Sequence, residues 1–134
     1  MNLVPYLFFP GHCEEALEFY KKVFKGEITY LQRFGDASMP VDEDYRDKIM
    51  HATLDCGDFT IQFSDGPPHK EITNGDNIHL TVNFDDETKM RLVWGKLSND
   101  GQVHMDLQDT FWGALYGQLE DKFGVRWMFN YEKK

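Results

Sequence analysis

The sequence predicts an α+β fold in which the order strand–helix–three strands, βαβββ, occurs twice. Two stretches with helical spacing of apolar residues lie 74 residues apart, and strand-like segments surround both of them. The 134 residues are 41% hydrophobic and 15% aromatic, which suits one domain with a sizeable core. We therefore expect a single domain over 1–134, with module one at 1–66, a linker at 67–76 and module two at 77–134.

The first half begins with an aromatic-rich segment at 3–9, which we expect to be a strand. Pro5 within it favours a strand start or a sheet edge. A helix is predicted over 14–24, with two glutamates in its first turn and Gly26 at its end. Its apolar stripe consists of Ala16, Phe19, Tyr20 and Val23.

Three further strands complete the first half. They are expected at 27–34, 49–55 and 59–64, with a turn at Cys56-Gly57-Asp58 between the last two. The stretch 35–47 is acidic and contains a proline, so we interpret it as a mobile, solvated loop.

The second half repeats this order. A strand is predicted at 78–84 and a helix that opens at Asp85-Asp86-Glu87. Strands are then expected at about 102–108, 113–119 and 125–131. A shift of 74 residues places the first apolar stripe on Met90, Val93, Trp94 and Leu97. The same shift places Val4, Tyr6 and Phe8 on Ile78, Leu80 and Val82.

Charge and composition exclude several classes of function. Fourteen basic and 23 acidic residues give a net charge of −9, which disfavours binding to nucleic acid or to anionic membranes. No apolar run reaches the roughly 20 residues of a membrane span, and the N-terminus does not resemble a signal peptide. Two cysteines are too few for a disulfide scaffold. These features predict a cytoplasmic protein.

The five histidines are scattered, without the close spacing typical of metal sites. His79 shares a predicted polar strand face with Asn77 and Thr81. That face can line a pocket, or it can face solvent and form cross-strand hydrogen bonds. His51 opens a predicted strand, where a structural role is the more common one.

The densest block of aromatics and glycines lies at 108–130. Trp112 and Tyr116 alternate with glycines, which let a backbone or a ligand approach closely, so these two side chains are candidates for either core or ligand packing. Trp127 and Phe129 are expected in the core.

This block contains the patterns W-G-x-x-Y-G at 112–117 and D-x-F-G-x-x-W at 121–127. With P-Y-L-F-F at 5–9, G-H-C-E-E-A-L-E-F-Y at 11–20 and S-D-G-P-P at 64–68, it resembles the PhnB-like branch of the glyoxalase/bleomycin-resistance/extradiol-dioxygenase, or vicinal oxygen chelate, superfamily. The resemblance implies two modules that form a curved mixed sheet around a cavity, commonly completed in a homodimer. Members of this branch often carry a name that means demethylubiquinone methyltransferase.

The resemblance also implies where a metal would bind. Metal-dependent members place one ligand on the first strand and one on the last strand of each module. The matching positions are Pro5, Ser64 or Asp65, Asn77 or His79, and Met128. Because proline and methionine are poor ligands for hard or borderline divalent ions, we expect neither a metal nor another cofactor.

Four functions remain open at this point. The first is a metal-free protein that binds a small molecule in a cavity lined by Tyr6, Phe8, Phe34, Asn77, His79, Trp112 and Tyr116. The second is a divergent lyase, isomerase or dioxygenase-type enzyme, with His79 as base or ligand. The third is a structural or partner-binding role without a small ligand. A methyltransferase-like activity, which the name used in this branch suggests, is a further alternative.

Overall fold

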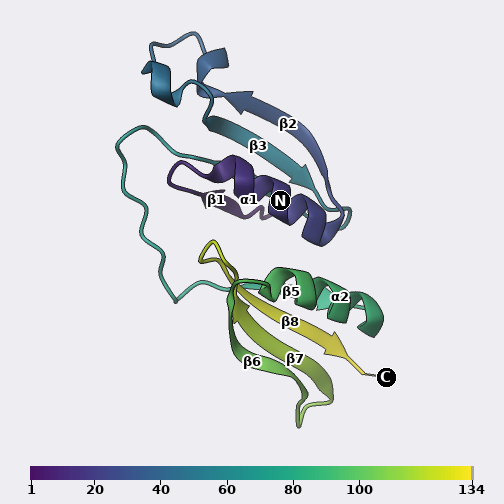
Figure 1. The fold of residues 1–134 in the computed structure, drawn as a ribbon. Coiled ribbons are helices and arrows are strands. Elements are labelled where there is room, and N and C mark those ends of the chain that lie inside the picture. Colours follow the sequence, from purple (N-terminus) through teal and green to yellow (C-terminus); the bar gives the residue numbers. More distant parts are fainter. Residues whose placement is uncertain (134) are drawn as a thin grey trace. The chain divides into compact units, whose positions relative to one another are not determined.

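A computed structural model describes residues 1–133, and these form two compact units, Met1–Ile72 and the segment that starts at Thr73. Each unit contains one long helix and one four-stranded mixed sheet (Figure 1). The predicted α+β class and the repeated βαβββ order are therefore confirmed. Neither sheet closes on itself. Within residues 1–133, no helix has the length and apolar character that crossing a bilayer requires.

The N-terminal unit has its sheet strands in the order β1-β4-β3-β2. β1 runs parallel to β4, and the other neighbours are antiparallel. Two short 3-10 helices occupy the segment predicted to be an irregular loop. The elements are β1 (Tyr6–Phe8), α1 (Cys13–Phe24), β2 (Glu27–Arg33), the 3-10 helices Phe34–Asp36 and Glu43–Tyr45, β3 (Ile49–Asp55) and β4 (Thr60–Ser64).

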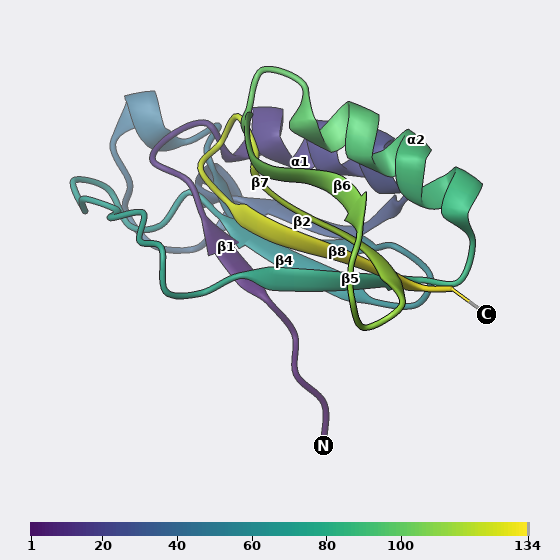
Figure 2. The same cartoon turned by 90° about the horizontal axis from the view of Figure 1, so that it is seen from below.

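The C-terminal unit repeats this topology, with the strand order β5-β8-β7-β6 and a parallel β5–β8 pair. Its elements are β5 (Leu80–Phe84), α2 (Glu87–Ser98), β6 (Gln102–Asp109), β7 (Ala114–Glu120) and β8 (Arg126–Glu132). Figure 2 shows α2 lying along one face of this sheet.

Both helices contain 12 residues and begin 74 residues apart, as the repeat predicted. The Asp86 carboxylate caps α2 and accepts a hydrogen bond from the backbone N–H of Thr88 at 2.8 Å. Each helix buries most of its predicted apolar stripe on its own sheet, but Phe19 in α1 and Trp94 in α2 are only partly buried. The buried helix residues are Cys13, Ala16, Leu17, Tyr20 and Val23 in α1, and Met90, Val93 and Leu97 in α2.

The face of each sheet that its own helix does not cover is called here the open face. Residues opposite each other on neighbouring strands share a face. Leu7 pairs with the buried Phe63 on the helix side, so Tyr6 and Phe8 belong to the open face. In β5, by contrast, Leu80 and Val82 pair with the buried Trp127 and Phe129 on the helix side.

The shift of 74 residues is therefore wrong for the first strands. It places the open-face residues Tyr6 and Phe8 on Leu80 and Val82, which lie on the helix face. Side chains alternate between faces along a strand, so a register error of one residue reverses the face.

Two predicted strand starts are also wrong. β1 begins at Tyr6 and β5 at Leu80, each later than the sequence pattern indicated. A strand needs a partner, and the pairing of β5 with β8 begins only at Leu80, opposite Trp127. Asn77 and His79 therefore precede the strand instead of lying on its polar face.

Candidate functional site

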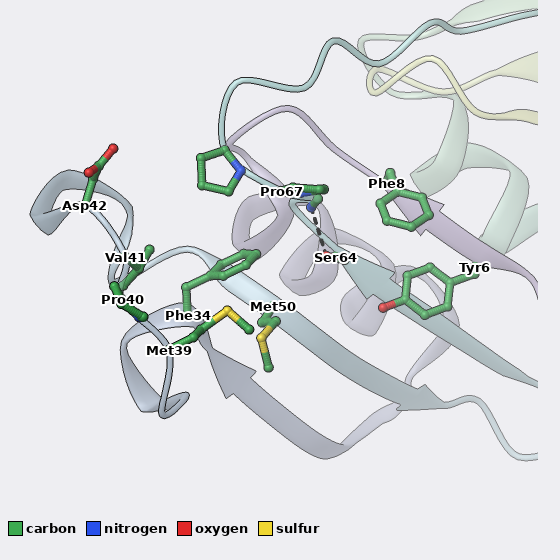
Figure 3. Close-up of a pocket in the computed structure, with 12 residues that line it drawn as sticks. Tyr6, Phe8, Phe34, Met39, Pro40, Val41, Asp42, Met50, Ser64 and Pro67 are labelled. Atoms are coloured by element: carbon green, nitrogen blue, oxygen red, sulfur yellow. Dashed lines mark hydrogen bonds between the residues drawn. The ribbon is translucent and has the colours of Figure 1, made fainter.

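A pocket of about 630 Å³ opens on the N-terminal unit (Figure 3). It lies between the aromatic residues of β1 and the segment that follows β2. The lining is mostly apolar, and consists of Tyr6, Phe8, Phe34, Met39, Pro40, Val41, Asp42, Met50, Ser64, Gly66, Pro67 and Pro68. A volume of this size is typical of a site for a small organic ligand.

β1 supplies one wall of the pocket. Tyr6 and Phe8 are two residues apart on the strand, and both lie on the open face, with their rings stacked at 4.9 Å between centroids. Their exposed fractions are 37% and 48%. Aromatic rings normally stabilise a protein by being buried, and these two are half-exposed. The pair is therefore an apolar surface that a ligand can cover.

The segment after β2 supplies the opposite wall. Phe34 is buried and donates its backbone N–H to the Lys48 carbonyl at 2.9 Å, which closes the segment at its base. Its ring lies 4.9 Å from that of Tyr45, whose hydroxyl donates to the Gly66 carbonyl at 2.7 Å. These contacts fix the wall against the end of β4.

Few polar groups reach the pocket. The Tyr6 hydroxyl is hydrogen-bonded to His51 Nδ1 at 2.8 Å. Burial raises the pKa of Tyr6, which keeps its phenol protonated at neutral pH. Ser64 Oγ already accepts the Gly66 N–H at 2.8 Å. Asp42 lies at the outer rim, 3.7 Å from His69.

Three of the seven predicted ligand-binding residues, Tyr6, Phe8 and Phe34, meet in this pocket. The other four, Asn77, His79, Trp112 and Tyr116, belong to the C-terminal unit and are not part of its lining. Their role in ligand binding stays a prediction.

His79 does not present a basic nitrogen to a ligand. Its Nε2 lies 3.0 Å from the Asp76 carbonyl, which can only accept, so Nε2 carries the proton. Nδ1 is buried and has no hydrogen-bond partner among residues 1–133. The geometry therefore gives no support to His79 as a general base.

The aromatic block at 108–130 divides between core and surface. Trp127 and Phe129 are buried, which confirms the core prediction for both. Tyr116 is also buried, and its hydroxyl accepts a hydrogen bond from Gln118 Nε2 at 3.0 Å. Trp112 is 54% exposed, and its ring packs edge-on against Tyr116 at 5.7 Å.

Sequence reasoning missed nine of the twelve lining residues, Met39 and Met50 among them, and also the neighbouring His51. Met39 lies within the acidic stretch interpreted as a solvated loop, and Met50 lies at a bulge in the β2–β3 register. His51, expected to be structural, bonds to the pocket residue Tyr6. The apolar run Met39-Pro40-Val41 inside an otherwise charged stretch was the one available signal.

The parallel strand pairs contain the positions at which the resemblance would place metal ligands. Pro5 directly precedes β1, and its carbonyl accepts the Gln62 N–H, while Tyr6 lies opposite Gln62 on the open face. In the C-terminal unit, Thr81 lies opposite Met128 and donates to its sulfur at 3.9 Å. Hydroxyl, amide and thioether groups make a poor donor set for a divalent ion.

Asp65, the carboxylate among the candidate metal ligands, already uses both of its oxygens in hydrogen bonds. Asp65 is buried, and its two oxygens accept the backbone N–H groups of Cys13 and Ile49, each at 2.8 Å. Within residues 1–133, neither unit gathers three histidine, cysteine, aspartate or glutamate side chains in a metal-binding arrangement. The residues present therefore do not fit a catalytic metal ion.

Comparison with known proteins agrees with this architecture. Residues 2–129 match the profile of the Glyoxalase/Bleomycin resistance protein/Dioxygenase superfamily. The chain belongs to this superfamily. It is 32% identical to protein YjdN of Escherichia coli (strain K12), an alignment that covers 100% of this chain and 97% of that protein.

Two solved structures have a similar fold and are similar in sequence to this chain. Protein PA1353 from Pseudomonas aeruginosa is 36% identical, with a TM-score of 0.89 and coverage of 100% of this chain and 99% of that one. A Bacillus cereus structure, described as a putative 3-demethylubiquinone-9 3-methyltransferase, PhnB protein, is 27% identical. Its TM-score is 0.81, with 98% and 99% of the two chains covered.

Proposed function

We propose that this superfamily member is a metal-free small-molecule-binding protein and that its ligand occupies the pocket of the N-terminal unit. The observation that carries the proposal is the stacked pair of Tyr6 and Phe8. These rings stand half-exposed over an apolar cavity instead of packing into the core. The misfit between the available donors and a divalent ion supports binding without a metal.

The lining indicates the kind of ligand. Aromatic, proline and methionine side chains suit a flat, largely apolar body, because aromatic rings stack and methionine adapts to irregular shapes. The one carboxylate of the rim, Asp42, and the net charge of −9 favour a cation over an anion at the outer end of the pocket.

The proposal includes a homodimer in the cytoplasm. It does not include methyl transfer. Nucleotide-type methyl donors bind at a glycine-rich turn after the first strand of a parallel sheet, and both sheets here are mixed, with only one parallel pair each.

Titration with a planar cationic dye, proflavine, tests the proposal. We expect saturable binding, followed by fluorescence, and a rise in the melting temperature. Phe8→Ala should weaken binding about 10-fold or more, since burying an aromatic side chain contributes about 1.5–3 kcal/mol. Phe111→Ala is the matched control, because Phe111 is exposed and does not line the pocket. Equal affinity of both variants would contradict the proposal.

Elemental analysis of the protein, purified without a histidine tag, tests the metal-free part. We expect well below one divalent ion per chain. One equivalent of nickel, zinc, iron or manganese that survives dialysis would overturn this part and favour a lyase or isomerase mechanism.

A further inference from the structure

We propose that Tyr6 and His51 form a proton-transfer pair that ionises a weakly acidic hydroxyl of the ligand, so that the ligand is a phenol or an enol. This inference rests on the proposed binding function of the same pocket. It names the class of ligand and assigns the site an acid–base step.

The geometry of the pair carries the inference. Tyr6 on β1 lines the pocket, and its hydroxyl lies 2.8 Å from Nδ1 of His51 on β3. The imidazole is packed between two rings, with centroids 5.5 Å from Tyr6 and 5.6 Å from Tyr30. These contacts on both sides hold the orientation of His51 toward the phenol.

The direction of this hydrogen bond is assigned from the chemistry of the two groups. A neutral phenol is a strong donor and an unprotonated imidazole nitrogen is a good acceptor, so Tyr6 donates to Nδ1. The proton of neutral His51 is then on Nε2, which has no hydrogen-bond partner within residues 1–133. The Tyr6 oxygen carries two lone pairs. The Ser64 side chain hydrogen-bonds to this hydroxyl and uses one of them, so one lone pair is left to accept a hydrogen bond in the pocket.

Because the Tyr6 oxygen is a hydrogen-bond acceptor, it favours a ligand that carries a hydrogen-bond donor at this end of the pocket. When a ligand hydroxyl donates to Tyr6, its O–H bond breaks and its proton forms a new O–H bond on Tyr6. At the same time the original Tyr6 proton moves to His51 Nδ1. The products are a phenolate or enolate, a neutral Tyr6 and an imidazolium, so atoms and charge balance. Tyr6 contacts the ligand, and His51 acts through Tyr6.

Among residues 1–133, no anionic side chain beside His51 would balance the charge of its imidazolium form, so the ionised ligand is the counter-ion. The titratable side chains in contact with it are Tyr6 from β1 and Tyr30 from β2, and the residue opposite it in the ladder is the neutral Gln32. In the part of the chain that the structure describes, no carboxylate bonds to His51. Asp42 lies at the opposite end of the pocket from Tyr6 (Figure 3).

The experiment uses the full chain and 4-nitrophenol, a phenol whose phenolate absorbs visible light and whose pKa lies near neutrality. We expect the probe to bind saturably. Bound probe should ionise at a pH at which the unbound probe is protonated, with an apparent ionisation constant raised at least tenfold. An unchanged ionisation constant for the bound probe overturns the inference while leaving the binding function intact.

Three variants locate the effect. His51→Asn keeps an acceptor near the position of Nδ1 but cannot take up a proton, and Tyr6→Phe removes the relay, so both should bind the probe without ionising it. Tyr30→Phe keeps the ring contact with His51 and should behave as wild type. Retained ionisation in His51→Asn overturns the inference. Binding of proflavine without binding of nitrophenol also overturns it, whereas failure of both probes contradicts the binding function itself.

Discussion

At the residue scale, Asp65 is a structural carboxylate that joins three elements. It follows β4 and accepts the first N–H of α1 and the N–H of Ile49 at the start of β3. We expect Asp65→Ala to lower the free energy of unfolding by roughly 2–6 kcal/mol, because each buried N–H left without a partner costs about 1–3 kcal/mol. Denaturant titration measures this. The exposed Asp58→Ala should change stability by less than about 0.5 kcal/mol.

Also at the residue scale, both thiols are expected to be inert in the folded protein. Burial raises the pKa of Cys13 far above its ordinary range, and burial with the nearby Asp55 raises that of Cys56 from 9.0 to about 12. Labelling with an aromatic disulfide at pH 8 should therefore be slow when folded and complete in denaturant. Rapid labelling of either thiol in the native state would contradict these shifts.

The same shifts predict how stability varies with pH. In the unfolded chain the thiols release protons above about pH 9, while in the folded chain they retain them. The stabilising contribution is thus complete below pH 9 and is lost as the pH rises from 9 toward 12. Replacement of Cys56 with serine should flatten this alkaline decline in denaturant midpoint.

At the scale of elements, two glycines with equal space around them should respond oppositely to alanine. An added Cβ meets no atom within 4 Å at Gly95 in α2 or at Gly57 in the β3–β4 turn. Gly95 is helical, so Gly95→Ala should stabilise by about 1 kcal/mol. Gly57 has φ of +91°, where an L side chain is strained, so Gly57→Ala should destabilise by about 1–2 kcal/mol. Thermal denaturation checks the two signs.

At the scale of the whole molecule, we expect a homodimer. Each sheet is open, with β1 and β2 at the edges of one and β5 and β6 at the edges of the other. Natural proteins usually cover or pair such edges. Light scattering at micromolar concentration should give about twice the 15.7 kDa of one chain. A mass near that of a single chain would contradict the prediction.

The order of elements was determined by the sequence alone. The predicted start of α1 differs from the observed one by one residue, and α2 begins at Glu87, the last residue of its predicted opening, because an amphipathic stripe reports its own local geometry. The family followed from motifs such as those around Trp112 and Trp127. Periodicity within a segment carries such information without reference to any other segment.

By contrast, only the tertiary structure decided which face of the sheet a strand residue lies on and which residues it contacts. A period of two says that side chains alternate, but only pairing with Gln62 and Ser64 puts Tyr6 and Phe8 on the open face. Likewise, β5 starts at Leu80 because its pairing with β8 begins there, opposite Trp127. The contact of His51 with Tyr6 joins residues 45 apart, and Met39 reaches the pocket because its loop folds back on the unit. Such contacts depend on how the strands associate, and the sequence of one segment does not encode its neighbours.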